Sequence, residues 1–454
     1  MVKIGLEIHG YIQTNEKLFC SCKAIHGLKF AKPNSNICPI CTSQPGAKPM
    51  LPNKVAIDKA IEIALILKCK INPKLVWQRK HYDWPDMPKG YQNTISGSHA
   101  MPIGENGKFL GIRIKEAHLE EDPAAWNPKT GEIDYNRSGL ALIEIVTQPD
   151  FSSSQEVVDW LKQLIMTLAY IRAFDKNAGI KADVNVSLPE LKGERVEIKN
   201  INSLTNIKNA IESEIKRQKS GNIVKIQETR MFDETNGTTI KMRGKEAAED
   251  YRFISDPDLP VILLEKSRIE KLSSSLPETP QEKLQKLIKK YNIEKKSAEV
   301  LTKKLEIAEF FEHIVDKVNP RLAVQWTTIE LLSVLNYNKK QLDEINIKEE
   351  HFIQLLKLIE NKKITELKAK EILRSWKEKS FSPETEAKKH SQISDKSEIE
   401  KIAKEIIKEN SNAVKDYKSG IKESLNFLIG KVMQKTNKRA DFKTTREILE
   451  KSLR

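Results

Sequence analysis

The hydrophobic pattern of this 454-residue chain changes at about residue 276, and this change limits the folds that the chain can adopt. Before that point, short runs alternate apolar and polar residues and are separated by most of the Gly, Pro and Trp. After it, apolar residues recur three and four positions apart, which is the spacing of one helix face. The sequence therefore predicts an α+β fold, with strands and a few helices before residue 276 and helices alone after it.

Three runs in the first part have the pattern of strands. The run KIGLEIHG places its isoleucines and leucine on one face and Glu7 and His9 on the other. Residues 111–122 read as a strand with an acidic end, and residues 139–147 as a buried strand interrupted by Glu144. A carboxylate on an apolar strand is costly to bury unless it is paired or binds a cation. These strands are therefore expected to carry the polar groups of a site.

Two helices are expected between the strands. One spans 152–171 and follows the capping pattern Ser153-x-x-Glu156, and the other spans about 203–219. Long strands with few helices between them predict a largely antiparallel or mixed sheet. We place this cradle domain at residues 1–276.

The second part predicts an all-helical domain over 277–384, a polar linker over 382–395 and a small helical tail domain over 396–454. The last 24 residues hold eight Lys or Arg and three acids, an excess of five positive charges. Phosphate binding needs such a basic surface, although a solvated helix face has the same composition. The tail is therefore a candidate nucleic-acid contact. Its candidate residues are Lys431, Lys435, Lys438 and Arg439.

The net charge of the whole chain is +14 and its pI is about 9.2, which favours a polyanionic partner such as RNA, DNA or an anionic membrane. Lysine is spread along the chain, so a Lys- and Ile-rich composition is the competing explanation. No stretch reaches the roughly 18 consecutive apolar residues of a membrane span, and the N-terminal run lacks the apolar core of a signal peptide. We therefore expect a cytoplasmic protein without a membrane partner.

Four of the five cysteines lie within 22 residues, in the pattern C-x-C, fifteen residues, then C-P-I-C. In a reducing cytosol such spacing indicates metal binding more often than disulfides, and four thiolates match a closed, structural zinc site. The competing interpretation is a set of unrelated buried thiols. Cys69 stands apart in a helical pattern and is expected in the core. The expected zinc ligands are Cys20, Cys22, Cys38 and Cys41.

The chain has no Walker phosphate loop and no G-x-S-x-G nucleophile elbow, so a nucleotide site would be of another kind. Acids and histidines instead fall on the expected strands, and oxygen ligands with an occasional imidazole suit Mg²⁺ that bridges nucleotide phosphates. Arg79, Lys80 and Lys89 would offset phosphate charge. Taken singly, each residue also fits a surface group or a salt bridge. The acidic and imidazole candidates are Glu7, His9, His118, Glu120, Glu121, Asp122 and Glu144.

Many runs of the chain resemble, in order, those of the GatB/GatE amidotransferase family. The first are IGLEIHGYIQTNEKLFCSC, PNSNICPICTSQPGAKP and RKHYDWPDMPKGYQ, followed by HLEED, DYNRSGLALIEIVTQPD, ADVNVS and VEIKNINSL. The last are QETRMFDE, MRGKEAAEDYRFISDPDLP and SGIKESLNFLIGKVMQKTNKRAD. The resemblance covers nearly the whole chain. The run after DPDLPVILL is too short for the inserted domain of the GatE branch, which favours the GatB branch.

The resemblance implies one member of a heterotrimeric enzyme. A kinase-like site in the cradle would use ATP to phosphorylate the side-chain carboxylate of Asp or Glu mischarged on tRNA. A partner amidase would release ammonia from glutamine, and the ammonia would displace the phosphate. A small third chain would wrap between the other two, and the tail would contact the tRNA. The implied cofactors are ATP, Mg²⁺ and Zn²⁺, and the sequence leaves open whether Asp-tRNA, Glu-tRNA or both are served.

The resemblance also implies roles for individual residues. The Mg²⁺ and ATP site would involve Glu7, His9, Glu120, Glu121 and Glu144. Lys80 and Lys89 match basic residues of the channel and active-site region, and Arg79 lies beside them. The motifs that line the cradle contribute Asp183, Asn185, Lys199 and Asn200.

Four positions depart from the pattern of the family. In the cradle, Lys181 and Ala182 stand where the family usually has Arg and Cys, which keeps the positive charge but not the guanidinium. In the tail, Asn437 replaces the usual Gly and Phe442 the usual Pro, which changes the expected turn of the basic loop.

Two other classes of protein fit parts of the sequence. A zinc-containing RNA-binding protein without catalysis would explain the cysteines and the basic tail, but not the acids on apolar strands. A self-contained ATP-dependent ligase or kinase would explain the acids, but the chain lacks a phosphate loop and an amidase nucleophile motif.

Overall fold

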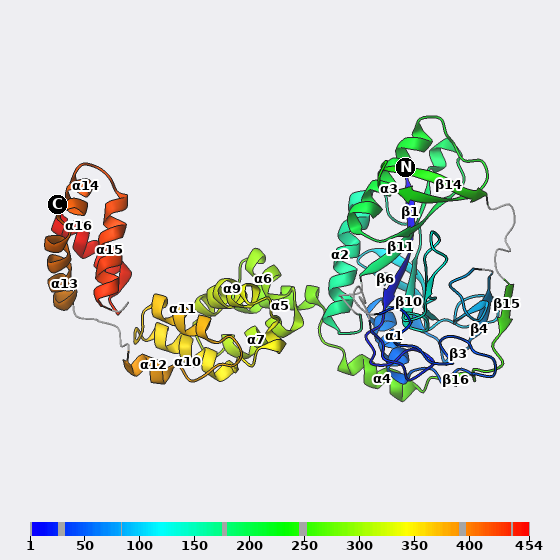
Figure 1. Ribbon diagram of the computed structural model, residues 1–454, viewed down its shortest axis with the longest axis horizontal. Helices are drawn as coiled ribbons and strands as arrows, with labels where there is room; N and C mark the ends of the chain where they lie inside the picture. Colours follow the sequence, from blue (N-terminus) through cyan, green and yellow to red (C-terminus); the bar gives the residue numbers. More distant parts are fainter. Residues whose placement is uncertain are drawn as a thin grey trace. The chain divides into compact units, whose positions relative to one another are not determined.

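The computed structural model describes residues 2–25, 32–82, 84–174, 179–244, 252–389, 396–436 and 439–453. The chain forms two compact units, Met1–Thr279 and Pro280–Arg454 (Figure 1). The first unit combines a large, mostly antiparallel sheet with helices and the second is helical, so the predicted α+β class is confirmed. Among the described helices, none has both the length and the apolar character needed to cross a lipid bilayer.

The described strands of the first unit form one twelve-stranded sheet in the order β14-β13-β12-β11-β1-β10-β7-β5-β4-β15, with β6 attached to β7 and β2 to β6. Its pairs are antiparallel except that β12 and β13 run parallel. The strands are β1 Lys3–Tyr11, β2 Lys70–Ile71, β4 Gln78–His81, β5 Tyr91–Thr94, β6 Gly104–Phe109, β7 Ile112–Glu121, β10 Ala141–Thr147, β11 Ile180–Ser187, β12 Val196–Ile201, β13 Glu228–Asp233, β14 Thr238–Gly244 and β15 Arg252–Ser255. Two short pairs lie outside it: β3 Lys74–Leu75 with β16 Ile262–Leu263, and β8 Ala125–Trp126 with β9 Ile133–Asp134.

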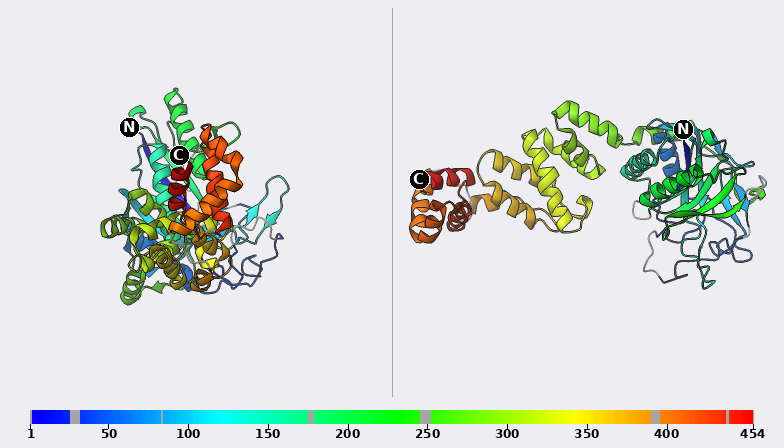
Figure 2. Two further views of the ribbon diagram at one scale, coloured as in Figure 1. Left: turned by 90° about the vertical axis from the view of Figure 1, so that its left-hand side faces the viewer. Right: turned by 90° about the horizontal axis from the view of Figure 1, so that it is seen from above.

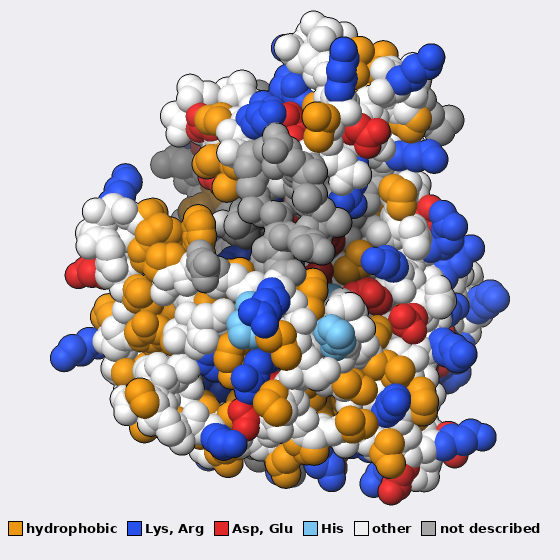
Figure 3. Space-filling view, turned by 90° about the vertical axis from the view of Figure 1, so that its right-hand side faces the viewer, with side chains coloured by type: hydrophobic (Ala, Val, Ile, Leu, Met, Phe, Trp, Pro, Cys, Tyr) orange, Lys and Arg blue, Asp and Glu red, His pale blue; other side chains and the backbone are white. Residues whose placement is uncertain are grey.

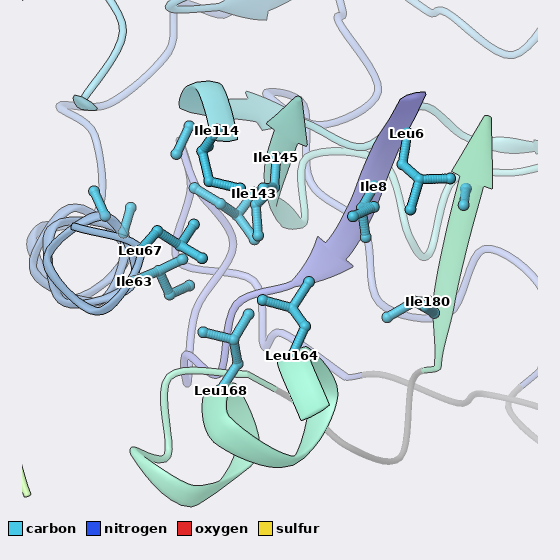
Figure 4. Packing of buried hydrophobic residues seen from close by; sticks show 14 of the residues in the cluster. Leu6, Ile8, Ile63, Leu67, Ile114, Ile143, Ile145, Leu164, Leu168 and Ile180 are labelled. Carbon is cyan, nitrogen blue, oxygen red and sulfur yellow. The ribbon is translucent and has the colours of Figure 1, made fainter. Parts of the chain in front are cut away.

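The pleat of this sheet separates an apolar face from a polar face. Successive side chains of a strand point to opposite sides, so Leu6 and Ile8 of β1 are buried while Glu7 and His9 lie on the other face. Figure 4 shows the apolar side chains of the strands gathered against Ile63 and the other helix residues. The three strands expected from the alternating pattern are β1, β7 and β10, at nearly the expected bounds.

Helices cover the apolar face of the sheet, and α2 and α3 lie side by side there (Figures 1 and 2). The Ser153 hydroxyl accepts a hydrogen bond from the Glu156 backbone N–H at 3.2 Å, as the capping pattern predicts. The Glu156 carboxylate, however, accepts from Ser152 rather than from the capping residue. The helices of this unit are α1 Lys54–Ile66, α2 Ser154–Tyr170, η1 Pro189–Leu191, α3 Leu204–Lys219 and α4 Lys266–Ser275.

The second unit contains two separate hydrophobic cores, one built from α5 to α12 and one from α13 to α16. The helices of the first core are α5 Pro280–Tyr291, α6 Lys295–Leu301, α7 Leu305–Val315, α8 Pro320–Gln325, η2 Trp326–Leu331, α9 Leu332–Tyr337, η3 Leu342–Glu344, α10 Glu349–Glu360, α11 Glu366–Ser375 and α12 Glu384–Lys389. Those of the second core are α13 Lys396–Glu409, α14 Ser411–Lys418, α15 Glu423–Lys435 and α16 Phe442–Leu453.

The prediction of a polar linker at 382–395 is partly wrong. Its first half forms α12, which begins with acids in its first turn and buries Ala387 in the core that it shares with α10. Acidic residues favour the start of a helix because they face the positive end of its dipole. The remaining residues, 390–395, lie outside the described part of the chain.

A buried ionic network fastens the β13–β14 hairpin to α3. The Glu214 side chain is fully buried, and Arg217 Nη2, Gln218 Nε2 and Thr239 Oγ1 each donate to it at 2.7 Å. Arg230 Nε lies 3.6 Å from its Oε2. A buried carboxylate with this many donors is stable only while all of the donors remain in place.

Replacing Glu214 with Ala should therefore destabilise the first unit by about 1–3 kcal/mol, because its buried donors would lose their acceptor while Arg217 and Arg230 keep Glu228 as a partner. Urea unfolding of the full chain, followed by far-UV circular dichroism, measures this loss. Glu194→Ala is the matched control, since Glu194 is exposed on the same unit. Equal unfolding midpoints for the two variants would contradict the role of the network.

Candidate active site

A pocket of about 940 Å³ lies on the polar face of the sheet. Its walls come from β1, β4, β5, β7, β10, β11, β12, β13 and β14, so strands far apart in the sequence contribute to one cavity. Of the residues expected in a site, it brings together Glu7, His9, Lys80, Glu120, Asp122, Glu144, Asp183 and Lys199.

The antiparallel register places one row of side chains across four strands. His9 lies opposite Glu144 and also opposite Lys181, and Glu144 lies opposite His118. His9 Nε2 is 3.2 Å from Glu144 Oε2 and 3.4 Å from Glu120 Oε1. His118 Nε2 is 3.2 Å from Glu144 Oε2 on the other side. Residues paired across strands share a face, so pairing alone assembles this group.

The charges in this row compensate one another. Burial by itself lowers the pKa of His9, but Glu144 and Glu120 outweigh it and raise the pKa to about 9. Burial acts in the same way on His118, where Glu144 and Glu116 raise the pKa to about 10. Burial tends to raise the pKa of Glu144, and the two histidines bring it well below its usual value. The row therefore favours a negative charge on Glu144 between two positively charged imidazoles.

A second group of acids lies beside the first and holds an internal cation. Lys199 Nζ is 2.6 Å from Asp183 Oδ2 and 2.7 Å from Glu197 Oε1. Asn185 Nδ2 donates to Glu7 Oε1 at 3.0 Å. Burial, followed by the charge of Glu144, raises the pKa of Glu7.

Both groups have the ligand chemistry of a hard divalent cation. The ligand atoms of His9, Glu120 and Glu144 lie within 4.8 Å of one another, and so do those of Glu7, Asp183 and Glu197. Carboxylate oxygens with one imidazole suit Mg²⁺ near phosphates. The first group fits this ion better, because the Lys199 ammonium lies among the acids of the second.

Five expected site residues of the described chain do not line this pocket. Two of them, His118 and Asn185, contact the lining residues Glu144 and Glu7. Of the other three, two point from their strands in the opposite direction. Glu121 follows Glu120 on β7; it accepts from the Asn93 N–H at 2.8 Å and forms an ion pair with Lys89. Arg79 precedes Lys80 on β4, so its side chain also points away from the pocket. It forms ion pairs with two aspartates, Asp256 at 3.0 Å and Asp258 at 2.6 Å. The third is Lys89, the partner of Glu121. The Asn200 side chain lies outside the described part of the structure.

Several groups of the pocket, among them Asp86, were not expected from the sequence. Glu197 shares a strand face with Lys199 two residues later, and that spacing was the signal that could have revealed it. Tyr11 and Arg137 meet at Asp122 on another wall: the Tyr11 hydroxyl donates to Asp122 Oδ2 at 2.7 Å, and Arg137 Nε lies 3.3 Å from the same oxygen. Arg137 comes from a loop, where no periodicity points to it.

The four clustered cysteines converge as the spacing predicts. Their sulfur atoms lie within 4.8 Å of one another, and the Cys38 N–H donates to Cys41 Sγ at 3.1 Å. The hydrogen bond from the Cys20 thiol is the main cause that lowers the pKa of Cys41 to about 5. This group can hold a thiophilic metal ion such as zinc. Cys69 is buried in the hydrophobic core, as expected.

A small cavity of about 50 Å³ separates the cysteines from the Lys89–Glu121 pair, and Cys20, Cys41 and Tyr91 also line it. The cysteine group thus shares a wall with the strand that carries Glu120 into the pocket. A metal at the cysteines would hold this wall without contacting the pocket's acids.

The basic residues of the tail are only partly available to a ligand. Lys435 forms ion pairs with Glu405 at 3.1 Å and Glu409 at 2.9 Å, and the Lys431 ammonium lies 5.4 Å from the centre of the Phe427 ring. Lys438 lies outside the described residues. On the face of the first unit seen in Figure 3, Lys and Arg are spread out and do not gather in one patch.

Comparison with known proteins agrees with the resemblance. The model of the GatB/GatE catalytic domain matches residues 2–270, and the model of the GatB domain matches residues 309–453. A protein of Methanococcus maripaludis, named as the B subunit of aspartyl/glutamyl-tRNA(Asn/Gln) amidotransferase, is 43% identical over all of this chain and 98% of its own length. Proteins of the same name from Methanopyrus kandleri and Methanothermobacter thermautotrophicus are 42% identical, over 98% and 100% of their lengths. The chain therefore belongs to the GatB/GatE family.

Proposed function

We propose that this chain activates aspartate or glutamate mischarged on a tRNA and completes its conversion to the amide. The family is part of a tRNA-dependent amidotransferase, a ligase that forms carbon–nitrogen bonds with glutamine as the amide donor. The observation that supports this role best is the pocket on the polar sheet face, where six acids or imidazoles converge with lysines.

The proposed reaction has two steps. In the first, a side-chain carboxylate oxygen of the aminoacyl group attacks the terminal phosphorus of ATP, and the bond from that phosphorus to the bridging oxygen breaks to release ADP. In the second, the nitrogen of ammonia attacks the carbonyl carbon of the acyl phosphate, phosphate leaves and a proton is lost. Activation is needed because a free carboxylate is a poor acceptor for ammonia, whereas phosphate is a good leaving group.

The charged residues of the pocket would have different roles in binding the nucleotide. His9, Glu120 and Glu144 would hold Mg²⁺, which, when bound, offsets the charge of the nucleotide phosphates. His118 lies behind Glu144 and would fix its orientation, as outer partners of metal ligands do. Lys80 would offset further phosphate charge from β4.

Two partner proteins complete this proposal: an amidase that releases ammonia from glutamine, and a small third chain that makes the assembly a heterotrimer. The chain itself has no G-x-S-x-G nucleophile motif. By this proposal, glutamine hydrolysis and carboxylate activation take place on different chains, so variants can separate them.

Replacing Glu144 with Gln should lower the ATP-dependent activation of mischarged tRNA by roughly 100-fold or more, because a ligand charge at the phosphates is lost. Glutamine hydrolysis by the assembled complex should remain. Release of ADP and of glutamate, measured in the same reaction, reports both activities. Glu132→Gln, on an exposed loop, is the control. Normal amide formation by the Glu144 variant would contradict the assignment of Glu144 as a metal ligand.

The cysteine group should contain about one equivalent of zinc, because four thiolates form a closed tetrahedral site. Elemental analysis of the purified chain measures the metal. Cys38→Ser should lose zinc and lower the melting temperature of the first unit, whereas Cys69→Ala should keep zinc although it opens a gap in the core. A metal-free wild type with unchanged stability would contradict this site.

The tail is proposed to bind the tRNA. Its core is separate from that of α5 to α12, so removing residues 390–454 leaves the other core complete. The truncated complex should bind mischarged tRNA more weakly and with a flatter salt dependence, since fewer counterions are released. Affinity at two salt concentrations tests this, and ATP binding should survive. Unchanged tRNA affinity of the truncated complex would contradict a role of the tail in tRNA binding.

A further inference from the structure

One end of the pocket holds a lysine that has no partner among the described residues. Lys181 lies on β11, opposite His9 in the register and on the same sheet face as Asp183. In the part of the chain that the structure describes, its ammonium makes no hydrogen bond and no ion pair. Lys199, in contrast, is fully engaged by two carboxylates. A half-buried ammonium with three open donors is available to a ligand that carries hydrogen-bond acceptors.

Arg137 offers further open donors at the same end. Its Nε is fixed by the Pro123 carbonyl at 2.9 Å and by Asp122 at 3.3 Å, and Asp122 is fixed in turn by Tyr11. Within the described residues, its two terminal nitrogens make no hydrogen bond. The positive charge of Arg137 acts on Lys181, so the two cations lie near each other. Their free donors match an oxyanion such as a carboxylate or a phosphate.

The same end holds an acceptor without a donor. Asp86 lines the pocket, and its buried Oδ1 has no hydrogen-bond partner within the described ranges of the chain. Its carboxylate interacts electrostatically with both Arg137 and Lys181, yet it forms an ion pair with neither among the described residues. The carboxylate of Asp86 and the cations Arg137 and Lys181 are therefore available to a ligand that has both a positive and a negative group.

We propose that this end of the pocket, formed by Asp86, Arg137 and Lys181, binds the amino-acid part of the substrate. Asp86 receives the α-ammonium group, and Lys181 and Arg137 bind the side-chain carboxylate before it is activated. This assignment rests on the proposed function. It adds a requirement that the function alone does not make: the α-amino group must be free and charged.

Binding without ATP tests the subsite apart from catalysis. The probes are tRNA mischarged with aspartate or glutamate, the same tRNA after N-acetylation, and uncharged tRNA, each titrated into the assembled complex. The wild type should bind the free-amine form about tenfold more tightly than the acetylated form, since a charge-assisted hydrogen bond is lost. In Asp86→Asn this preference should largely vanish, and Asp159→Asn, exposed on α2, should keep it.

The lysine is tested by steady-state kinetics. Lys181→Met should raise KM for mischarged tRNA by roughly tenfold or more while KM for ATP stays the same, and Lys181→Arg should recover most of the loss. Lys225→Met, exposed on the same unit, is the control. A rise in KM for ATP alone would mean that the oxyanion is a nucleotide phosphate, and it would overturn the assignment.

The two proposals fail in different ways. Equal binding of free and acetylated forms by the wild type overturns the subsite even if the complex phosphorylates its substrate. A binding preference that depends on Asp86 supports the subsite even if no phosphorylation is found, in which case the proposed function falls instead.

Discussion

The antiparallel register of β1 with its two neighbours is the constraint on which the rest of the site depends. It sets His9 opposite Glu144 on one side and opposite Lys181 on the other, and Glu144 opposite His118. A slip of one residue would turn every one of these side chains toward the helices. The buried residues of β1, Leu6 and Ile8, prevent this slip, because it would expose them to the pocket. Packing on one face thus fixes chemistry on the other.

Electrostatic balance explains why this face can be so polar and still fold. Buried carboxylates are unfavourable alone, but Glu144 lies between two histidines, and Asp183 and Glu197 share the Lys199 ammonium. The balance is uneven along the pocket. The acids beside His9 and Lys199 are satisfied internally or suited to a divalent cation, whereas Lys181 and Arg137 keep open donors. A pocket with this polarity can orient a substrate that is itself charged at both ends.

The edges of the cradle are held by means other than the apolar core. On one side the Glu214 network fastens the β13–β14 hairpin, which contributes Thr229 and Met242 to the pocket. On the other, the cysteine group lies against the wall that carries the Lys89–Glu121 pair. The network residues Glu228 and Arg230 flank Thr229 on β13, so the network holds this part of the pocket wall without lining the pocket itself.

The sequence by itself determined the α+β class, the bounds of β1, β7 and β10, the face of Glu7 and His9, and the convergence of the cysteines, because periodicity and short spacing are local properties. It also placed the chain in its family. It did not determine which of Glu120 and Glu121 faces the pocket, since both are acidic and only the observed register assigns the pocket face. Nor did it reveal Arg137 or Asp86, which come from loops without periodicity. Their meeting with Lys181 was decided by the tertiary structure, because strand pairing brings together residues that no sequence interval relates.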